Sequence, residues 1–76
     1  MGLQNINIRQ ARYKLAMLIG DNIMYHYGEK QWYSMPLRKR KFIIEDLFND
    51  NHLQEKFRLS DEEAKKVIKS VQDIEG

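Results

Sequence analysis

The chain has 76 residues and no cysteine, with 42% apolar residues, 32% charged residues and a formal net charge of +2. This length fits a single domain over residues 1–76, since independently folding domains are rarely shorter than about 50 residues. The absence of cysteine excludes disulfides, thiolate metal ligands and a cysteine nucleophile. The longest uninterrupted apolar run, 15–19, is too short to span a membrane, and the N-terminus lacks a signal-peptide pattern, so we expect a cytoplasmic protein.

The small net charge conceals two halves of opposite sign. Residues 1–41 contain eight lysines and arginines against two acids, whereas residues 42–76 contain five against nine. Such a division is typical of a basic face that binds an anionic partner, or of two halves that attract each other. Alternatively, the fold interleaves the two halves and their charges average out.

Helical spacing of apolar residues predicts a long first helix over 8–27, capped by Asn7 and ended by Gly28. Its main apolar stripe comprises Ile8, Ala11, Leu15, Leu18, Ile19 and Ile23. A second stripe on nearly the opposite side comprises Tyr13, Met17 and Met24, with small Gly20 beside it. A helix with so little polar surface is either central to the fold or shared with another chain. We therefore predict a homodimer whose interface contains Tyr13, Met17, Gly20 and Met24.

The middle of the chain predicts a polar connection over 28–34, followed by a second helix that Ser34 caps and that accepts Pro36 in its first turn. This helix ends at 49–51. The side chains that it is expected to bury are Leu37, Ile43, Ile44, Leu47 and Phe48. The spacing of Asn51 and Gln54 resembles a capping box, which predicts a short third helix over 52–57, anchored by Leu53 and Phe57.

A fourth helix carries the strongest local signal. Ser60 and Glu63 are spaced as a capping box, and Leu59 and Ala64 occupy the positions of a hydrophobic staple. The apolar face expected to follow comprises Ala64, Val67, Ile68, Val71 and Ile74. We predict an all-α fold, a compact four-helix domain with a long first helix and a short third one.

The inventory of chemically active groups is too sparse for an enzyme. His26 and His52 lie in different helices without metal-ligand spacing, and His26 falls on the main apolar stripe near a helix end. Neighbouring acids such as Glu45 and Asp46 diverge around a helix, and 49–51 lacks the glycine and glutamate of a calcium loop. We expect no catalytic residue, no metal, no cofactor and no small-molecule substrate.

The run Arg38, Lys39, Arg40 and Lys41 is the clearest candidate for contact with nucleic acid. Four consecutive cations spread around a helix and oppose the dipole at its N-terminal end, and phosphate contact would explain this placement. Salt bridges to the acidic C-terminal half, or pairing of Lys41 with Glu45, would explain it equally well.

The segment 53–71 loosely resembles a helix-turn-helix, with a short helix, a tight turn and a second helix. Two features depart from that motif. Arg58 stands where the turn usually has glycine, and the second helix opens with three acids, 61–63, which phosphates and base edges repel. Ordinary packed helices are the alternative.

Four aromatic residues, Tyr25, Tyr27, Trp32 and Tyr33, lie close together in sequence. Tyrosine and tryptophan dominate protein interfaces, and they also stack on single-stranded bases. Alternatively, Trp32 folds over the end of the helices as a lid on the core.

Together these patterns predict a small non-enzymatic interaction or regulatory protein that binds another protein and forms a homodimer. The hypothetical partner-binding residues are Tyr25, Tyr27, Trp32, Tyr33, Arg38, Lys39, Arg40 and Lys41. The alternative is a nucleic-acid-binding protein that uses Arg38–Lys41 or a helix-turn-helix at 53–71. The frequent asparagine, isoleucine and lysine are typical of phage or mobile-element proteins from low-GC genomes.

Overall fold

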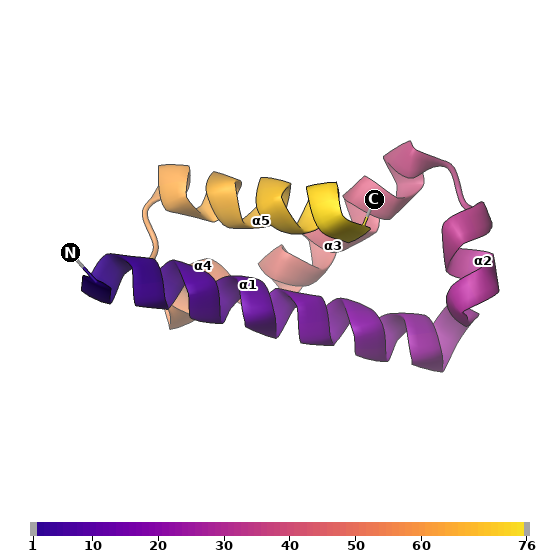
Figure 1. Cartoon of the computed structure of the whole chain (residues 1–76), viewed down its shortest axis with the longest axis horizontal. Helices are drawn as coiled ribbons and strands as arrows, with labels where there is room; N and C mark the ends of the chain where they lie inside the picture. Colours follow the sequence, from indigo (N-terminus) through magenta and orange to yellow (C-terminus); the bar gives the residue numbers. More distant parts are fainter. Residues whose placement is uncertain (1, 76) are drawn as a thin grey trace.

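The computed structural model describes the backbone of residues 2–75 and the side chains of residues 7–74. Its elements are α1 (Gly2–Asn22), the π-helical turn η1 (Ile23–Tyr27), α2 (Glu29–Ser34), α3 (Leu37–Asp50), α4 (Leu53–Lys56) and α5 (Asp61–Glu75). No strand occurs over 2–75, so the predicted all-α class is confirmed. In Figure 1, α1 runs the length of the molecule, α5 lies alongside it, and α2 forms one end.

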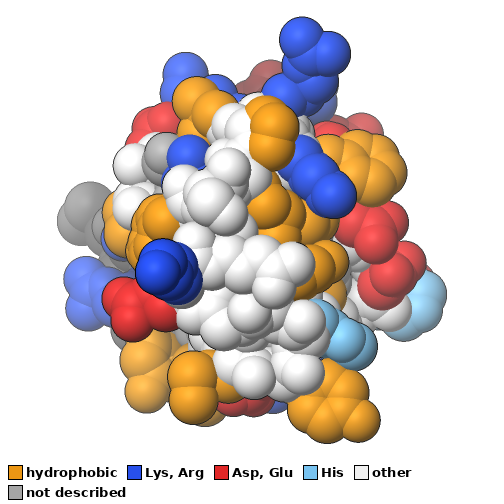
Figure 2. All heavy atoms as spheres, turned by 90° about the vertical axis from the view of Figure 1, so that its right-hand side faces the viewer, with side chains coloured by type: hydrophobic (Ala, Val, Ile, Leu, Met, Phe, Trp, Pro, Cys, Tyr) orange, Lys and Arg blue, Asp and Glu red, His pale blue; other side chains and the backbone are white. Residues whose placement is uncertain are grey.

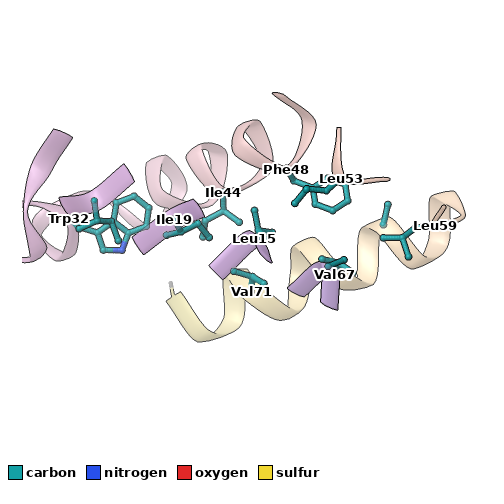
Figure 3. Packing of buried hydrophobic residues seen from close by; sticks show 12 residues of the cluster. Leu15, Ile19, Trp32, Ile44, Phe48, Leu53, Leu59, Val67 and Val71 are labelled. Atoms are coloured by element: carbon teal, nitrogen blue, oxygen red, sulfur yellow. The ribbon is translucent and has the colours of Figure 1, made fainter. Parts of the chain in front are cut away.

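One core joins all five helices and η1. The predicted main stripe of α1 is confirmed as its buried face, and α3 and α5 both pack against α1. The buried side chains are Ala11, Leu15, Ile19, Ile23, Trp32, Ile44, Phe48, Leu53, Leu59, Ala64, Val67 and Val71 (Figure 3). Burial of this apolar surface is the main force that holds such short helices together, because isolated helices of this length are marginal in water.

The first helix begins earlier than predicted. α1 starts at Gly2, so Asn7 lies inside the helix and is not its N-cap. No proline or glycine separates Gly2 from Asn7, and asparagine is tolerated within a helix at a cost well below 1 kcal/mol. The predicted stop at Gly28 is confirmed, although not in the αL conformation expected of it: its φ of 81° and ψ of 155° lie in another region that favours glycine.

The last turn before Gly28 is a π-helix rather than an α-helix, and the backbone N–H of Gly28 donates to the carbonyl of Ile23, five residues earlier. A π-turn rotates less per residue than an α-helix, so side chains within it leave the positions of the α-helical wheel. His26 was expected on the apolar stripe and is instead exposed, and this shift explains the difference.

The predicted polar connection is a short helix, α2. The Trp32 side chain of α2 is fully buried in the core, and this burial explains why the polar segment is ordered. Ser34 does not cap the next helix, because its hydroxyl donates to the carbonyl of Gln31 at 2.8 Å within α2. Pro36 occupies the N-cap position of α3 instead.

The second residue after the end of α3, and the second after the end of α4, has a positive φ although neither is glycine. His52, with a φ of 54°, follows α3, and Arg58, with a φ of 53°, follows α4. After α4 the N–H of Leu59 donates to the carbonyl of Gln54, and that of Arg58 donates to the carbonyl of Glu55. These two bonds define a Schellman motif with Arg58 in the position that glycine usually occupies.

The predicted capping box of Asn51 and Gln54 is wrong. The Asn51 side-chain amide donates to the carbonyl of Leu47 at 2.8 Å, and the Gln54 amide donates to the Asp61 carboxylate at 2.8 Å. Because the left-handed backbone of His52 ends α3 there, no N-cap geometry remains for Asn51. The short third helix that the box was used to predict is present as α4.

The capping box at α5 is confirmed in both directions. The N–H of Glu63 donates to the Ser60 hydroxyl at 3.1 Å, and the N–H of Ser60 donates to the Glu63 carboxylate at 2.8 Å. Two residues expected in the core are exposed: Leu37 in the first turn of α3 and Ile74 near the end of α5. Both lie at helix ends, where the packed neighbours no longer cover them.

Candidate interaction surfaces

The outward face of α1 carries the second apolar stripe of the sequence. Tyr13 is 69% exposed, Met17 48% and Met24 82%, although the core is complete without them. Gly20 lies on the same face, and a Cβ added to it would meet nothing within 4 Å. Tyr13, Met17 and Gly20 therefore lie on one uncovered face of α1, and Met24 is exposed in η1, which continues this helix. We call these four residues the α1 seam.

A shallow groove of about 240 Å³ borders this seam, between α1 and α5. Apolar side chains from Ala16, Val71 and Ile74 line it together with Tyr13, and Arg9 and Arg12 add positive charge. Sequence analysis missed this groove because Ile74 follows the apolar spacing of α5 and was expected in the core. The groove extends the apolar surface of the seam onto the second helix.

The N-terminal end of α3 forms a second surface, where Pro36, Arg38, Lys39 and Phe42 line an open cleft. We call this set the α3 cleft. Phe42 is 66% exposed, and sequence analysis did not single it out. Its position two residues before buried Ile44, about 200° around the helix, was the signal that it points outward. Figure 2 shows cationic and hydrophobic side chains next to each other over the upper part of this end of the molecule.

The four consecutive cations do not share one surface. Arg38 and Lys39 flank the α3 cleft, whereas the Arg40 guanidinium lies 5.6 Å from the ring centre of Tyr33, within cation–π distance. Lys41 faces another groove, between α3 and α5, which Glu45, Lys65, Ile68, Lys69, Gln72 and Asp73 also line. The four cations therefore lie in three different local environments.

Salt bridges do not explain the placement of three of these cations. Among the side chains of residues 7–74, no ion pair joins Arg38, Lys39 or Lys41 to an acid, neither to the C-terminal half nor to Glu45. Lys41 contacts α5 through its backbone: the side-chain amide of Gln72 donates a hydrogen bond of 3.1 Å to the Lys41 carbonyl. Arg38 and Lys39 thus present their charge to solvent.

The aromatic residues divide between interior and surface. Trp32 is fully buried, its indole N–H has no hydrogen-bond partner among the described residues, and its ring lies 6.4 Å from that of half-buried Tyr27. Tyr25 and Tyr33 are exposed. Trp32 is thus a lid on the core, and of these four aromatic residues Tyr25 and Tyr33 are the ones that are exposed to a partner.

The segment compared with a helix-turn-helix consists of the single turn α4, a connection and α5. The left-handed φ of Arg58 shows that the connection has the backbone form for which the motif uses glycine. Asp61 and Glu62 are exposed at the start of α5, where a recognition helix would approach DNA, as are Lys65, Lys66 and Lys69. Function at this segment stays a prediction.

The described residues contain no cluster of three or more histidine, cysteine, aspartate or glutamate side chains suited to a metal ion. His26 packs edge-on against Tyr25 with ring centres 4.8 Å apart. The Nδ1 atom of His52 lies 3.4 Å from the Glu55 carboxylate, with both side chains largely exposed. Each histidine therefore has a local contact on the surface, His26 in η1 and His52 in the turn between α3 and α4.

None of the helices over the described residues has the length and apolar character that a membrane span requires. Comparison of the chain with family models, with curated proteins and with solved structures finds no match. A functional interpretation therefore rests on the surfaces themselves.

Proposed function

We propose that this protein is a small non-enzymatic interaction protein that binds a protein partner at the α3 cleft and associates with a second copy of itself through the α1 seam. One observation carries the proposal. The core is closed without Tyr13, Met24, Tyr25 and Phe42, yet each of these side chains is more than half exposed. Exposed apolar side chains that gather in patches mark interaction sites.

The composition of the α3 cleft favours a protein partner. Phe42 and Pro36 supply apolar surface, and Arg38 and Lys39 surround it with charge. An apolar centre with a charged rim is typical of protein interfaces, in which aromatic residues and arginine contribute most binding energy. Because the rim is positive and without ion pairs, we propose that the partner presents an acidic rim around an apolar side chain.

Nucleic-acid binding is the second candidate, and the exposed charges of Arg38 and Lys39 beside Phe42 favour it. A cation beside an exposed aromatic ring is the combination that binds single strands. The distribution of the four cations over three surroundings weighs against it, because phosphate binding needs cations aligned along one backbone.

The test begins with recovery of partners from the native host on immobilised protein, followed by measurement of the affinity of the purified partner. We expect Phe42→Ala to weaken binding by about 30-fold, equal to about 2 kcal/mol. The double change Arg38→Gln and Lys39→Gln should weaken it less, mainly by slowing association. Lys66→Ala is the control, since Lys66 is exposed on α5 and lines neither the cleft nor the groove beside the α1 seam.

Fluorescence anisotropy with random single-stranded and double-stranded DNA of about 30 nucleotides distinguishes the two candidates. Under the main proposal, binding to DNA is weak and Phe42→Ala affects the protein partner alone. Tight binding to DNA that falls steeply with salt, and that is lost when Arg38 and Lys39 are neutralised, would overturn the main proposal in favour of the second candidate.

A further inference from the structure

The α1 seam has the spacing of a coiled coil. Tyr13, Met17, Gly20 and Met24 follow one another at intervals of four, three and four residues, the alternation that separates the two core positions of a coiled-coil heptad. Tyr13, Met17 and Gly20 lie on the exposed side of α1, opposite the stripe that fills the core, and Met24 is exposed in η1, which continues α1. The helix thus carries one face for its own fold and another with the pattern that receives a second helix.

Gly20 is not needed by the fold of a single chain. Its helix is regular at this point, and a side chain added there would meet no atom within 4 Å. Within a helix interior, glycine is less favourable than every other residue except proline. An unobstructed glycine that lowers the stability of its own helix is accounted for if another helix packs closely against it.

The sizes of the seam residues match best when two copies of α1 run antiparallel. With a two-fold axis midway between Met17 and Gly20, each Met17 packs on Gly20 of the partner copy, and each Tyr13 packs on Met24 of the partner copy. Met17 then fills the space that Gly20 leaves, and the Met24 sulfur contacts the Tyr13 ring. A parallel pair would instead place Gly20 on Gly20 and leave a void, which is unfavourable.

The charged residues beside the seam also favour an antiparallel pair of α1 helices. Lys14 and Asp21 directly follow Tyr13 and Gly20, so both lie on one flank of the seam. Both are exposed, and within the described part of the chain neither makes an ion pair. Antiparallel pairing brings each Lys14 beside Asp21 of the partner copy. Parallel pairing would bring each Lys14 beside Arg9 of the partner copy, two like-charge contacts.

We infer that two copies of this chain associate through an antiparallel pairing of their α1 helices, with Met17 packed on the partner's Gly20 and Lys14 paired with the partner's Asp21. This arrangement rests on the self-association in the proposed function and specifies its geometry. The seam is narrow, and interfaces below about 1,200 Å² are typical of weak association. The dimer therefore forms in the micromolar range or above.

Sedimentation equilibrium of the full chain, from about 10 µM to about 1 mM, measures the dimer constant. Lys14→Glu and Asp21→Lys should each weaken dimerisation by about tenfold, and the double variant with both changes should restore it. Lys66→Glu, an exposed reversal of the same charge on α5, should leave the constant unchanged. Circular dichroism confirms that each variant folds.

Gly20→Leu provides an independent readout, because it should abolish the dimer while the stability of the monomer toward urea rises, since leucine is a better helix former than glycine. Strengthening of the dimer by Lys14→Glu would overturn the inference in favour of parallel helices. A wild-type dimer that tolerates both Lys14→Glu and Gly20→Leu would refute the α1 geometry but leave self-association in place. A wild-type chain that stays monomeric at every concentration would refute self-association itself, without bearing on the α3 cleft.

Discussion

Replacement of Trp32 tests whether the end of the core is built as described. The side chain is 0% exposed, packed between α2 and the rest of the core, with the ring of Tyr27 beside it. Truncation of a buried tryptophan to alanine destabilises proteins by about 3 to 5 kcal/mol. A 76-residue domain has a total stability of about 4 to 11 kcal/mol at typical values per residue. Trp32→Ala therefore removes a large share of the stability.

Trp32→Phe is the informative comparison. It keeps most of the buried apolar surface and deletes the indole N–H, which has no hydrogen-bond partner among the described residues. A buried donor without a partner costs about 1 to 3 kcal/mol, and its removal offsets part of the loss from the smaller ring. We expect Trp32→Phe to lie within about 1 kcal/mol of the wild type.

Urea denaturation followed by far-ultraviolet circular dichroism measures both variants. The single tryptophan of the wild type adds a second probe, since its fluorescence should be that of a buried indole and shift to longer wavelength on unfolding. An unfolding midpoint for Trp32→Ala equal to that of the wild type, or the emission of a solvated indole in the native protein, would refute the burial of this residue.

Three further predictions concern helix ends and the histidines. Ser60→Ala removes the capping-box bond to the N–H of Glu63 and should lower the free energy of unfolding by about 1 kcal/mol in urea titrations; an unchanged value would contradict the cap. Arg58→Gly relieves the strain of a left-handed backbone at a residue with a side chain, so it should raise the free energy of unfolding by about 0.5 to 1 kcal/mol. Arg58→Ala should not raise the free energy of unfolding, and stabilisation by both changes would exclude backbone strain as the cause. The double change His26→Gln and His52→Gln should leave the affinity for the partner intact, and its loss in a folded variant would place a functional histidine.

The sequence determined the local features of this fold. The capping box of Ser60 and Glu63 and the glycine stop at Gly28 were predicted correctly, because each depends on a few neighbouring residues and on backbone geometry that they impose themselves. The buried stripe of α1 was predicted for a similar reason, since Leu15 and Ile19 repeat with the period of the helix.

The predictions that were wrong involve choices between local alternatives that distant contacts settle. Asn51 and Gln54 have the spacing of a capping box, yet the left-handed turn at His52 and the bond from Gln54 to Asp61 replace it. The polar segment 29–34 is helical because burial of Trp32 compensates for its weak helical pattern. Packing energy of several kcal/mol outweighs such local preferences, which are worth less than about 1 kcal/mol each.

Identification of the candidate surfaces needed both the sequence and the tertiary structure. The sequence alone grouped Tyr13, Met17, Gly20 and Met24 on one side of a helix, because helical periodicity is local information. Only the tertiary structure decided that α3 and α5 cover the opposite side and leave this one open, and that Trp32 lies inside the core. Exposure depends on what packs against a side chain, and no short-range pattern contains that information.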